Sequence, residues 1–425
     1  MPDSRTTWMK AVPKEWRVTT IGSLYTLRNE KVSDKDYPPL SVTMKGIVPQ
    51  LESAAKTEDG DNRKLVRIGD FAINSRSDRR GSCGISAYDG SVSLINTVLI
   101  PREKMHPGYY NWLFHSSAFS DEFYKWGHGI VDDLWTTRWQ EMKRIVVPVP
   151  PMPEQEAIAA YLDEQCILID ATIAEAKCSI EDYRAWRASI IFEAVTKGLD
   201  NDAKLIESGI DGLGKIHASS RIIKLRHLIE NIESGVSVNA GQDAARGDEI
   251  GVLKTSCVSK NKFIAEENKN VNREEYSRVA CPVKGNSLIV SRMNTPELVG
   301  ACGYVDKDYP NLFLPDRLWQ ITCLPTCNTK YVWYFLSSKY TRNYYASLAT
   351  GTSSSMQNIS QAQFGNLRIA LPNIEEQERI AKYLDAICEQ IDAITENTQA
   401  LIANLESYKR SLIFEVVTGK RKVVQ

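Results

Sequence analysis

The sequence predicts an α+β protein in which two similar globular domains are joined by two long antiparallel coiled-coil helices, as a pseudo-twofold internal repeat. Three observations lead to this prediction. Residues 154–198 recur at 376–420 with 19 of 45 positions identical, far above chance. Both copies have the apolar period of a coiled coil. The segments that precede the two copies also correspond to each other, and both mix strand-like with helix-like patterns.

Each copy of the repeated segment begins with a helix start signal. In PPMPEQE, Pro153 lacks only an N–H that a helix start leaves unpaired, and Glu154 faces the positive end of the helix dipole. In NIEEQE, Asn373 precedes Glu376 by three residues, which is the spacing of a capping box. We therefore expect both long helices to begin close to these residues.

The apolar residues then recur alternately four and three positions apart for more than four heptads, with Arg187 and Lys409 at matching polar positions. Such a seam indicates a coiled coil, and about 44 helical residues extend roughly 66 Å. One narrow seam buries little, so we expect the copies to pack on each other; the alternative is that each helix packs only on its own domain. The predicted seam consists of Leu162, Ile169, Ile173, Ile180, Tyr183, Ile190, Leu384, Ile391, Ile402, Leu405 and Leu412.

The duplication extends beyond the helices. The offset is 222 at the helices, 219 between GSCG at Gly81 and GACG at Gly300, and 216 between GDFAINSR at Gly69 and GNSLIVSR at Gly285. It falls to 204 between VPKEWRV and IHASSRI, so the second copy has insertions in its first half. The predicted organisation is a domain at 1–152, a helix at 153–198, a linker at 199–220, a domain at 221–372, a helix at 373–420 and a tail at 421–425.

Within each domain, short β-branched runs such as FAINS, VSLINTVLI, SLIVS and LWQIT predict strands. The aromatic-rich segments 109–126 and 331–348 predict one helix each. Both domains are therefore expected to be α+β.

The net charge of -1 conceals an uneven distribution. Segments 1–150 and 221–372 have net charges of +3 and +5, whereas 151–198, 199–220 and 373–425 have -5, -2 and -2. Two mildly basic domains thus alternate with acidic segments, although such small values also fit ordinary solvated surfaces. No apolar run approaches the ~18 residues of a membrane span, and the N-terminus has no apolar core of a secretory signal, so we expect a cytoplasmic protein.

Motifs of catalysis and of cofactor binding are absent from the sequence. It contains no GxxxxGK[ST], HExxH or GxSxG, and no GxGxxG follows a strand. The nine cysteines are scattered without a CxxC pair, which favours ordinary reduced thiols over a metal site. We therefore expect no catalytic residue, metal or cofactor in this chain.

Basic and polar residues in loops are the candidates for contacts with DNA. SRSDRRGS and SRMNTPELVG follow equivalent strands, and arginine can read guanine while asparagine reads adenine. KTSCVSKNK and GTSSSMQN add cations, hydroxyls and amides suited to phosphate. Each loop alone also fits solvated surface. The candidates are Arg76, Arg79, Arg80, Lys254, Lys260, Lys262, Arg292, Asn294, Thr352, Ser353, Ser354 and Gln357.

With these residues identified, residues 8–420 resemble the DNA specificity subunit of type I restriction–modification systems. The resemblance rests on EQEAIAAYLD with AVTKGLD, on the second copy EQERIAKYLD, and on VPKEWRV and IHASSRI. One departure is Ser220, which stands where the first copy has Trp16.

The resemblance implies a subunit without catalysis of its own, in which two target-recognition domains each read one half of a bipartite site on double-stranded DNA. The antiparallel helices would set the gap and dock two methyltransferase subunits, which bind S-adenosylmethionine, and restriction subunits that use ATP and Mg would join them. Two alternatives remain open: a self-sufficient DNA methyltransferase or nuclease with an unrecognised active site, and a coiled-coil assembly scaffold without DNA recognition.

Overall fold

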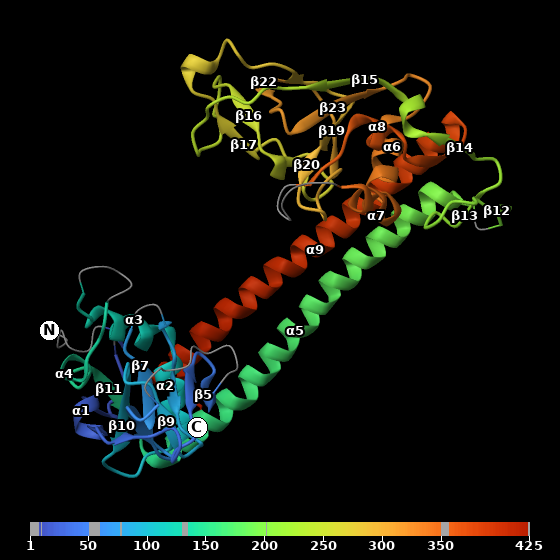
Figure 1. Cartoon of the computed structure of the whole chain (residues 1–425). Helices are drawn as coiled ribbons and strands as arrows, with labels where there is room; N and C mark the ends of the chain where they lie inside the picture. Colours follow the sequence, from blue (N-terminus) through green and yellow to red (C-terminus); the bar gives the residue numbers. More distant parts are fainter. Residues whose placement is uncertain are drawn as a thin grey trace. The chain divides into compact units, whose positions relative to one another are not determined.

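The computed structural model describes residues 8–9, 11–50, 60–76, 79–129, 135–200, 202–349 and 357–423. The chain divides into two compact units (Figure 1). Unit 1 comprises Met1–Lys177 with Thr398–Gln425, and unit 2 comprises Cys178–Asn397. Each unit therefore contains one globular domain and part of both long helices. No helix in the described part of the chain is long and apolar enough to cross a membrane.

The globular part of unit 1 is built on a four-stranded antiparallel sheet in the order β2-β10-β7-β8. Smaller sheets pair β1 with β11, β4 with β5, and β3, β6 and β9 with one another. The elements are β1 Arg17–Thr20, α1 Ile21–Leu24, β2 Tyr25–Leu27, β3 Lys31–Val32, β4 Leu40–Thr43, β5 Gly46–Pro49, β6 Arg63–Val66, β7 Phe71–Asn74, β8 Cys83–Ile85, β9 Gly90–Val92, β10 Asn96–Pro101, α2 Pro107–His115, α3 Ser117–Lys125, α4 Trp139–Met142, β11 Val146–Val149 and α5 Met152–Lys197.

Unit 2 repeats this plan with the sheet β15-β23-β19-β21, and adds a sheet β17-β16-β22-β18. A hairpin, β12 with β13, occupies the predicted linker. The elements are β12 Leu205–Glu207, β13 Lys215–His217, β14 Arg221–Lys224, β15 Ile229–Ser234, β16 Gly251–Leu253, β17 Asn268–Asn270, β18 Pro282–Val283, β19 Ser287–Ser291, β20 Met293–Asn294, β21 Cys302–Val305, β22 Tyr309–Phe313, β23 Leu318–Cys323, α6 Thr329–Leu336, α7 Lys339–Leu348, β24 Gln357–Asn358, α8 Gln361–Gly365, β25 Arg368–Leu371 and α9 Ile374–Val417.

The two sheets confirm the internal repeat at the offsets expected from the sequence. The starts of β7 and β19 differ by 216 residues, those of β8 and β21 by 219, and those of β10 and β23 by 222. Two glycines are needed at equivalent places: Gly81 and Gly300 both have positive φ, at 77° and 74°. The repeat therefore preserves backbone conformation as well as strand order.

The two predicted aromatic helices are each broken in the middle, so one prediction in each domain was wrong. Ser116 ends α2 and caps α3 by accepting a hydrogen bond from the Phe119 N–H. Ser338 caps α7 in the same way, accepting from Thr341. Both serines are extended, with ψ of 140° and 153°. The competition of a serine side chain for backbone N–H groups explains each break, because it offers the chain an alternative to helix.

The long helices α5 and α9 begin where the sequence predicts, and the Asn373 side chain accepts from the Glu376 N–H at 2.9 Å. Within each unit, the beginning of one helix packs with the end of the other, so the pair is antiparallel (Figure 1). In unit 1, Lys409 Nζ lies 2.6 Å from Asp170 of α5. In unit 2, Arg187 Nε lies 3.6 Å from Asp392 of α9. The four residues are related by the repeat.

The predicted seam lies on the packed side of the helices. Leu162, Leu384 and Leu412 are almost completely buried. The remaining seam positions are buried or half-buried: Ile169, Ile173, Ile180, Tyr183, Ile190, Ile391, Ile402 and Leu405. At the ends of the helices the seam merges with the core of each globular domain, so helix pairing and domain packing share one hydrophobic cluster in each unit.

Each globular domain is attached by a buried tyrosine hydroxyl to the long helix that belongs to the other half of the repeat. In unit 1, the Tyr109 hydroxyl lies 3.0 Å from the Val417 carbonyl oxygen of α9 and 3.3 Å from that of Pro148. In unit 2, the Tyr331 hydroxyl lies 3.0 Å from the Val195 carbonyl oxygen of α5 and 2.6 Å from that of Ala370. Each domain thus contacts the last turn of the helix that belongs to the other half of the repeat.

Candidate DNA interface

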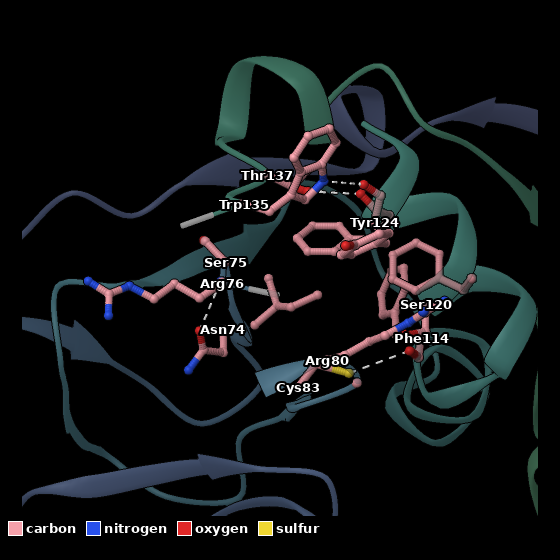
Figure 2. A pocket seen from close by; sticks show the side chains of 14 residues that line it. Asn74, Ser75, Arg76, Arg80, Cys83, Phe114, Ser120, Tyr124, Trp135 and Thr137 are labelled. Carbon is pink, nitrogen blue, oxygen red and sulfur yellow. Dashed lines mark hydrogen bonds between the residues drawn. The ribbon is translucent and has the colours of Figure 1, made fainter. Parts of the chain in front are cut away.

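In unit 1 the loop after β7 carries the predicted arginines. Arg76 is exposed, its backbone N–H donates to Asn74 Oδ1 at 3.0 Å, and it forms a β-bridge with Thr136. The bridge joins this loop to the segment that follows 130–134, although the two are far apart in sequence. Figure 2 shows the Arg76 guanidinium pointing away from the small hollow that the two segments line.

Arg80 lies on the other rim of the same hollow (Figure 2). Its guanidinium is paired with Asp121 and lies 5.0 Å from the centre of the Tyr124 ring. An ion pair and a cation–π contact together restrict the side chain, although both groups remain partly exposed. Arg79 is exposed beside them, and its N–H donates to the Arg76 carbonyl oxygen at 3.4 Å.

The hollow includes residues that the sequence analysis did not select. The Trp135 indole donates to the Tyr124 carbonyl oxygen at 2.9 Å, and the Thr137 hydroxyl donates to that of Phe123 at 2.8 Å. These bonds hold the segment after 130–134 against α3. The available signal was the aromatic and hydroxyl run WTTRW, because its position 222 residues before Gln357 matches a segment that the sequence analysis did select.

Unit 2 pairs the corresponding segments, but Arg292 is half-buried whereas Arg76 is exposed. β20 pairs with β24, with Met293 opposite Asn358 and Asn294 opposite Gln357. The Arg292 guanidinium lies 5.7 Å from the centre of the Trp319 ring system, and Asn294 Nδ2 donates to Ser291 Oγ at 3.3 Å. Three predicted residues, Arg292, Asn294 and Gln357, are therefore brought together from two distant segments. Thr352, Ser353 and Ser354 lie outside the described residues.

The predicted lysine loop has a different place. Lys254 directly follows β16, and the sheet of β16 is a different one from the sheets of β19 and β20, between which Arg292 lies. Lys260 and Lys262 are exposed, and Lys262 Nζ lies 3.9 Å from Asp392 of α9. The structure therefore directs Lys262 toward the helix pair rather than toward the β20–β24 pair.

Among the described residues, no group of three or more His, Cys, Asp or Glu side chains could hold a metal ion. The described cysteines are unpaired thiols, and burial raises the pKa of Cys83 to about 12. A thiol with so high a pKa is protonated at neutral pH, so it does not act as a nucleophile.

Comparison with known proteins finds similar sequences among the specificity subunits of type I restriction enzymes. Residues 245–404 match the family model of the type I restriction modification DNA specificity domain. The chain is 23% identical to the EcoKI specificity subunit of Escherichia coli K12, over 65% of this chain but only 58% of that protein. It is 24% identical to the MjaVIII specificity subunit of Methanocaldococcus jannaschii, over 97% of this chain and 94% of that protein.

Solved structures share the fold along almost the whole chain. A chain from a structural study of complex assembly and conformational transition of the type I R-M system superposes with a TM-score of 0.74, at 15% identity, over 97% of this chain and 100% of that one. The HsdS subunit from Thermoanaerobacter tengcongensis gives a TM-score of 0.55 at 16% identity, over 98% and 100%. The family match thus identifies residues 245–404 as similar to a type I restriction modification DNA specificity domain, and the solved structures show that nearly the whole chain shares their fold.

Proposed function

We propose that the two globular domains, taken as residues 1–152 and 221–372, are target-recognition domains that each read one half of a bipartite site on double-stranded DNA. The observation that carries this proposal is the repeated pairing of loops: Arg76 bridges Thr136 in unit 1, and Met293 pairs with Asn358 in unit 2. Each unit thereby presents an arginine beside a second polar segment. Arginine and amide side chains are the groups that read base edges and grip phosphates.

The two long helices then serve as a spacer and as the docking site for partner subunits. Their outer faces carry large apolar side chains that the seam does not use. Ile167 is 68% exposed, and Trp186 and Tyr408, which the repeat relates, are 47% and 46% exposed. These exposed apolar side chains are the groups through which partner subunits would contact the helices. Two methyltransferase subunits, which would bring S-adenosylmethionine, fit a helix pair with two related faces; restriction subunits with ATP and Mg would join that complex.

Substitution of the loop arginines tests the reading role. In the complex with methyltransferase subunits, Arg76→Ala and Arg292→Ala should each weaken binding of the cognate duplex by about 1–3 kcal/mol. Each variant should lose recognition of one half-site only, and the two variants should lose different half-sites. Competition with duplexes that are altered in one half-site measures this. Arg410→Ala, an exposed arginine on α9, is the matched control. Unchanged affinity in both variants would reduce the two arginines to surface residues.

A change of helix length tests the spacer role. Deletion of one heptad from each helix, at positions related by the 222-residue offset, keeps the seam in phase. The gap between the half-sites should then change while the half-sites themselves stay the same. Sequencing of methylated adenines in cells that express the complete system measures both quantities. An unchanged gap would show that the helices do not set the spacing.

A further inference from the structure

Two aspartates on α9 mark the place where the globular domain of unit 2 meets the long helices. Asp385 and Asp392 are seven residues apart, so two helical turns bring them to the same side of α9. The repeat relates them to Asp163 and Asp170 of α5 in unit 1. The two units can therefore be compared contact by contact at these four positions.

Both units make two contacts of the same kind here. The Trp112 indole of α2 donates to Asp163 at 2.8 Å, and the Tyr334 hydroxyl of α6 donates to Asp385 at 2.9 Å. The second aspartate of each pair forms the ion pair that joins the two helices. The shared contacts thus join domain to helix through a neutral donor, and helix to helix through charge.

Unit 2 adds two lysines of its globular domain to the same aspartates. Lys330 Nζ of α6 lies 2.5 Å from Asp385, and Lys262 Nζ lies 3.9 Å from Asp392. Lys330 also lies over the Tyr304 ring of β21, 5.4 Å from its centre, so two groups restrict its side chain. In unit 2 the domain is therefore joined to α9 by charge as well as by a neutral donor.

Lys262 reaches α9 because the hairpin that carries it is longer in unit 2. A two-residue turn at 44–45 joins β4 to β5, whereas the segment 254–267 joins β16 to β17. A Cβ on Gly84 of β8 would lie 2.9 Å from the backbone of the first hairpin, and one on Gly303 of β21 would lie 2.4 Å from that of the second. Both hairpins thus cross the same strand of the repeat, and only the second is long enough to extend to the helices.

Trp333 of α6 holds the longer loop in place. Its indole donates to the Asn261 carbonyl oxygen at 3.0 Å. Asn261 has a φ of 53°, in the left-handed region that asparagine adopts more readily than most residues. The backbone directly before Lys262 is therefore fixed by a hydrogen bond to α6, and the next residue along the chain pairs with Asp392.

We propose that Lys262 and Lys330 are positioning residues that hold the globular domain of unit 2 at one place on α9, so that binding of its half-site depends on the gap, an inference that rests on the proposed reading role of this domain. Seven helical residues span about 10.5 Å. Two ion pairs at this separation oppose rotation of the domain about either one. In unit 1, Gly108 stands in place of Lys330, and the short turn at 44–45 stands in place of the loop with Lys262.

Duplexes with an altered gap test this role in the full chain complexed with methyltransferase subunits. One base pair more or less displaces a half-site by about 3.4 Å and turns it by about 34°. The wild-type complex should bind both altered duplexes more weakly than the duplex with the normal gap. In K262E/K330E this preference should fall by at least about threefold, the scale expected from losing two partly exposed ion pairs. K339E/R368E reverses two exposed cations elsewhere in unit 2 and should keep the preference.

Two further variants separate positioning from folding. K330R keeps the positive charge and should keep the gap preference. K330E/D385K reverses both partners of one ion pair and should recover part of the preference that K330E loses. Hydrogen exchange at 254–263 should be faster in K262E/K330E than in the wild type, and added salt should narrow this difference because it screens the wild-type pairs. Circular dichroism checks that each variant folds.

The outcomes that contradict the positioning role differ from those that contradict the reading role. An unchanged gap preference in K262E/K330E would overturn the positioning role. An equal loss of affinity at every gap would assign the two lysines to contacts with DNA, and would overturn it as well. A wild-type complex that does not distinguish its half-sites by sequence would contradict the proposed function itself, on which the positioning role depends.

Discussion

The two units solve one packing problem with different residues. In unit 1 the Trp8 indole, on the segment before β1, donates to the Val146 carbonyl oxygen at 2.9 Å. In unit 2 the carbonyl oxygen at the equivalent position, that of Arg368, accepts from the Tyr340 hydroxyl of α7 at 3.1 Å. Tyr340 corresponds to Ala118, and Trp8 to Gly212, so each unit pairs one aromatic donor with one small residue.

This exchange shows which features a duplicated fold retains. Both halves keep an aromatic side chain that fills the space near β11 or β25 and donates a hydrogen bond to the first carbonyl oxygen of that strand. The segment that supplies this side chain differs: it precedes β1 in unit 1 and is α7 in unit 2. By contrast, the tyrosine that joins each domain to the helix of the other half of the repeat, Tyr109 or Tyr331, is the same in both units. Packing in the domain periphery can therefore diverge, while the attachment of domain to helix stays constant.

The largest expected effect comes from removing the aromatic donor of unit 1. Trp8→Gly should destabilise unit 1 by about 3–5 kcal/mol, because a large buried side chain leaves a cavity. Adding Ala118→Tyr transplants the arrangement of unit 2 and should recover part of the loss. Hydrogen exchange followed by mass spectrometry would report on each unit separately. A double variant no more stable than Trp8→Gly would show that the two solutions are not interchangeable.

A smaller, symmetric effect is expected at the shared tyrosines. Tyr109→Phe and Tyr331→Phe each remove a buried hydroxyl and leave buried carbonyl oxygens without that donor, which costs about 1–3 kcal/mol. The two losses should agree closely, because the hydrogen bonds are equivalent. The measurement is the same exchange experiment at the last turns of α9 and α5. A large loss in one unit only would mean that the attachment of domain to helix has also diverged.

The helix ion pairs should contribute less, and unequally. Lys409 Nζ lies 2.6 Å from Asp170, whereas Arg187 Nε lies 3.6 Å from Asp392. Double-mutant cycles with methionine and asparagine should give roughly 0.2–1 kcal/mol for such partly exposed pairs, with the larger value in unit 1. Both values should fall as salt is added. Equal coupling energies would show that the difference in distance does not set the relative strength of the two ion pairs.

The smallest expected effect is a pH dependence confined to unit 1. Burial lowers the pKa of His115 below its ordinary value, against hydrogen bonds to backbone that raise it. The folded state then binds fewer protons than the unfolded state, so stability is complete above about pH 6.5 and declines as the pH falls below it. Ser337 stands at this place in unit 2. His115→Ser should flatten the decline of unit 1 between pH 7.5 and 5, and an unaltered profile would assign the decline to other groups.

Much of this fold follows from local patterns that the sequence displays openly. The seam from Leu162 to Leu412 depends only on the period of apolar residues, and the helix start at Asn373 depends on a side chain three residues before Glu376. The sequence patterns did not predict the helix breaks at Ser116 and Ser338, although both serines lie inside the predicted helices. A serine inside an aromatic run is compatible with helix or with a cap, and packing decides between them.

The sequence by itself determined that the chain is a tandem repeat of an α+β domain followed by a long helix, because periodicity and self-similarity are properties of a one-dimensional string. Only the tertiary structure decided which distant segments meet: Arg76 with Thr136, Asn294 with Gln357, and Lys262 with Asp392. Likewise, only the packed structure showed that the Tyr340 hydroxyl makes in unit 2 the hydrogen bond that the Trp8 indole makes in unit 1. Such pairings depend on which side chains fill a common space, and no spacing along the chain encodes that choice.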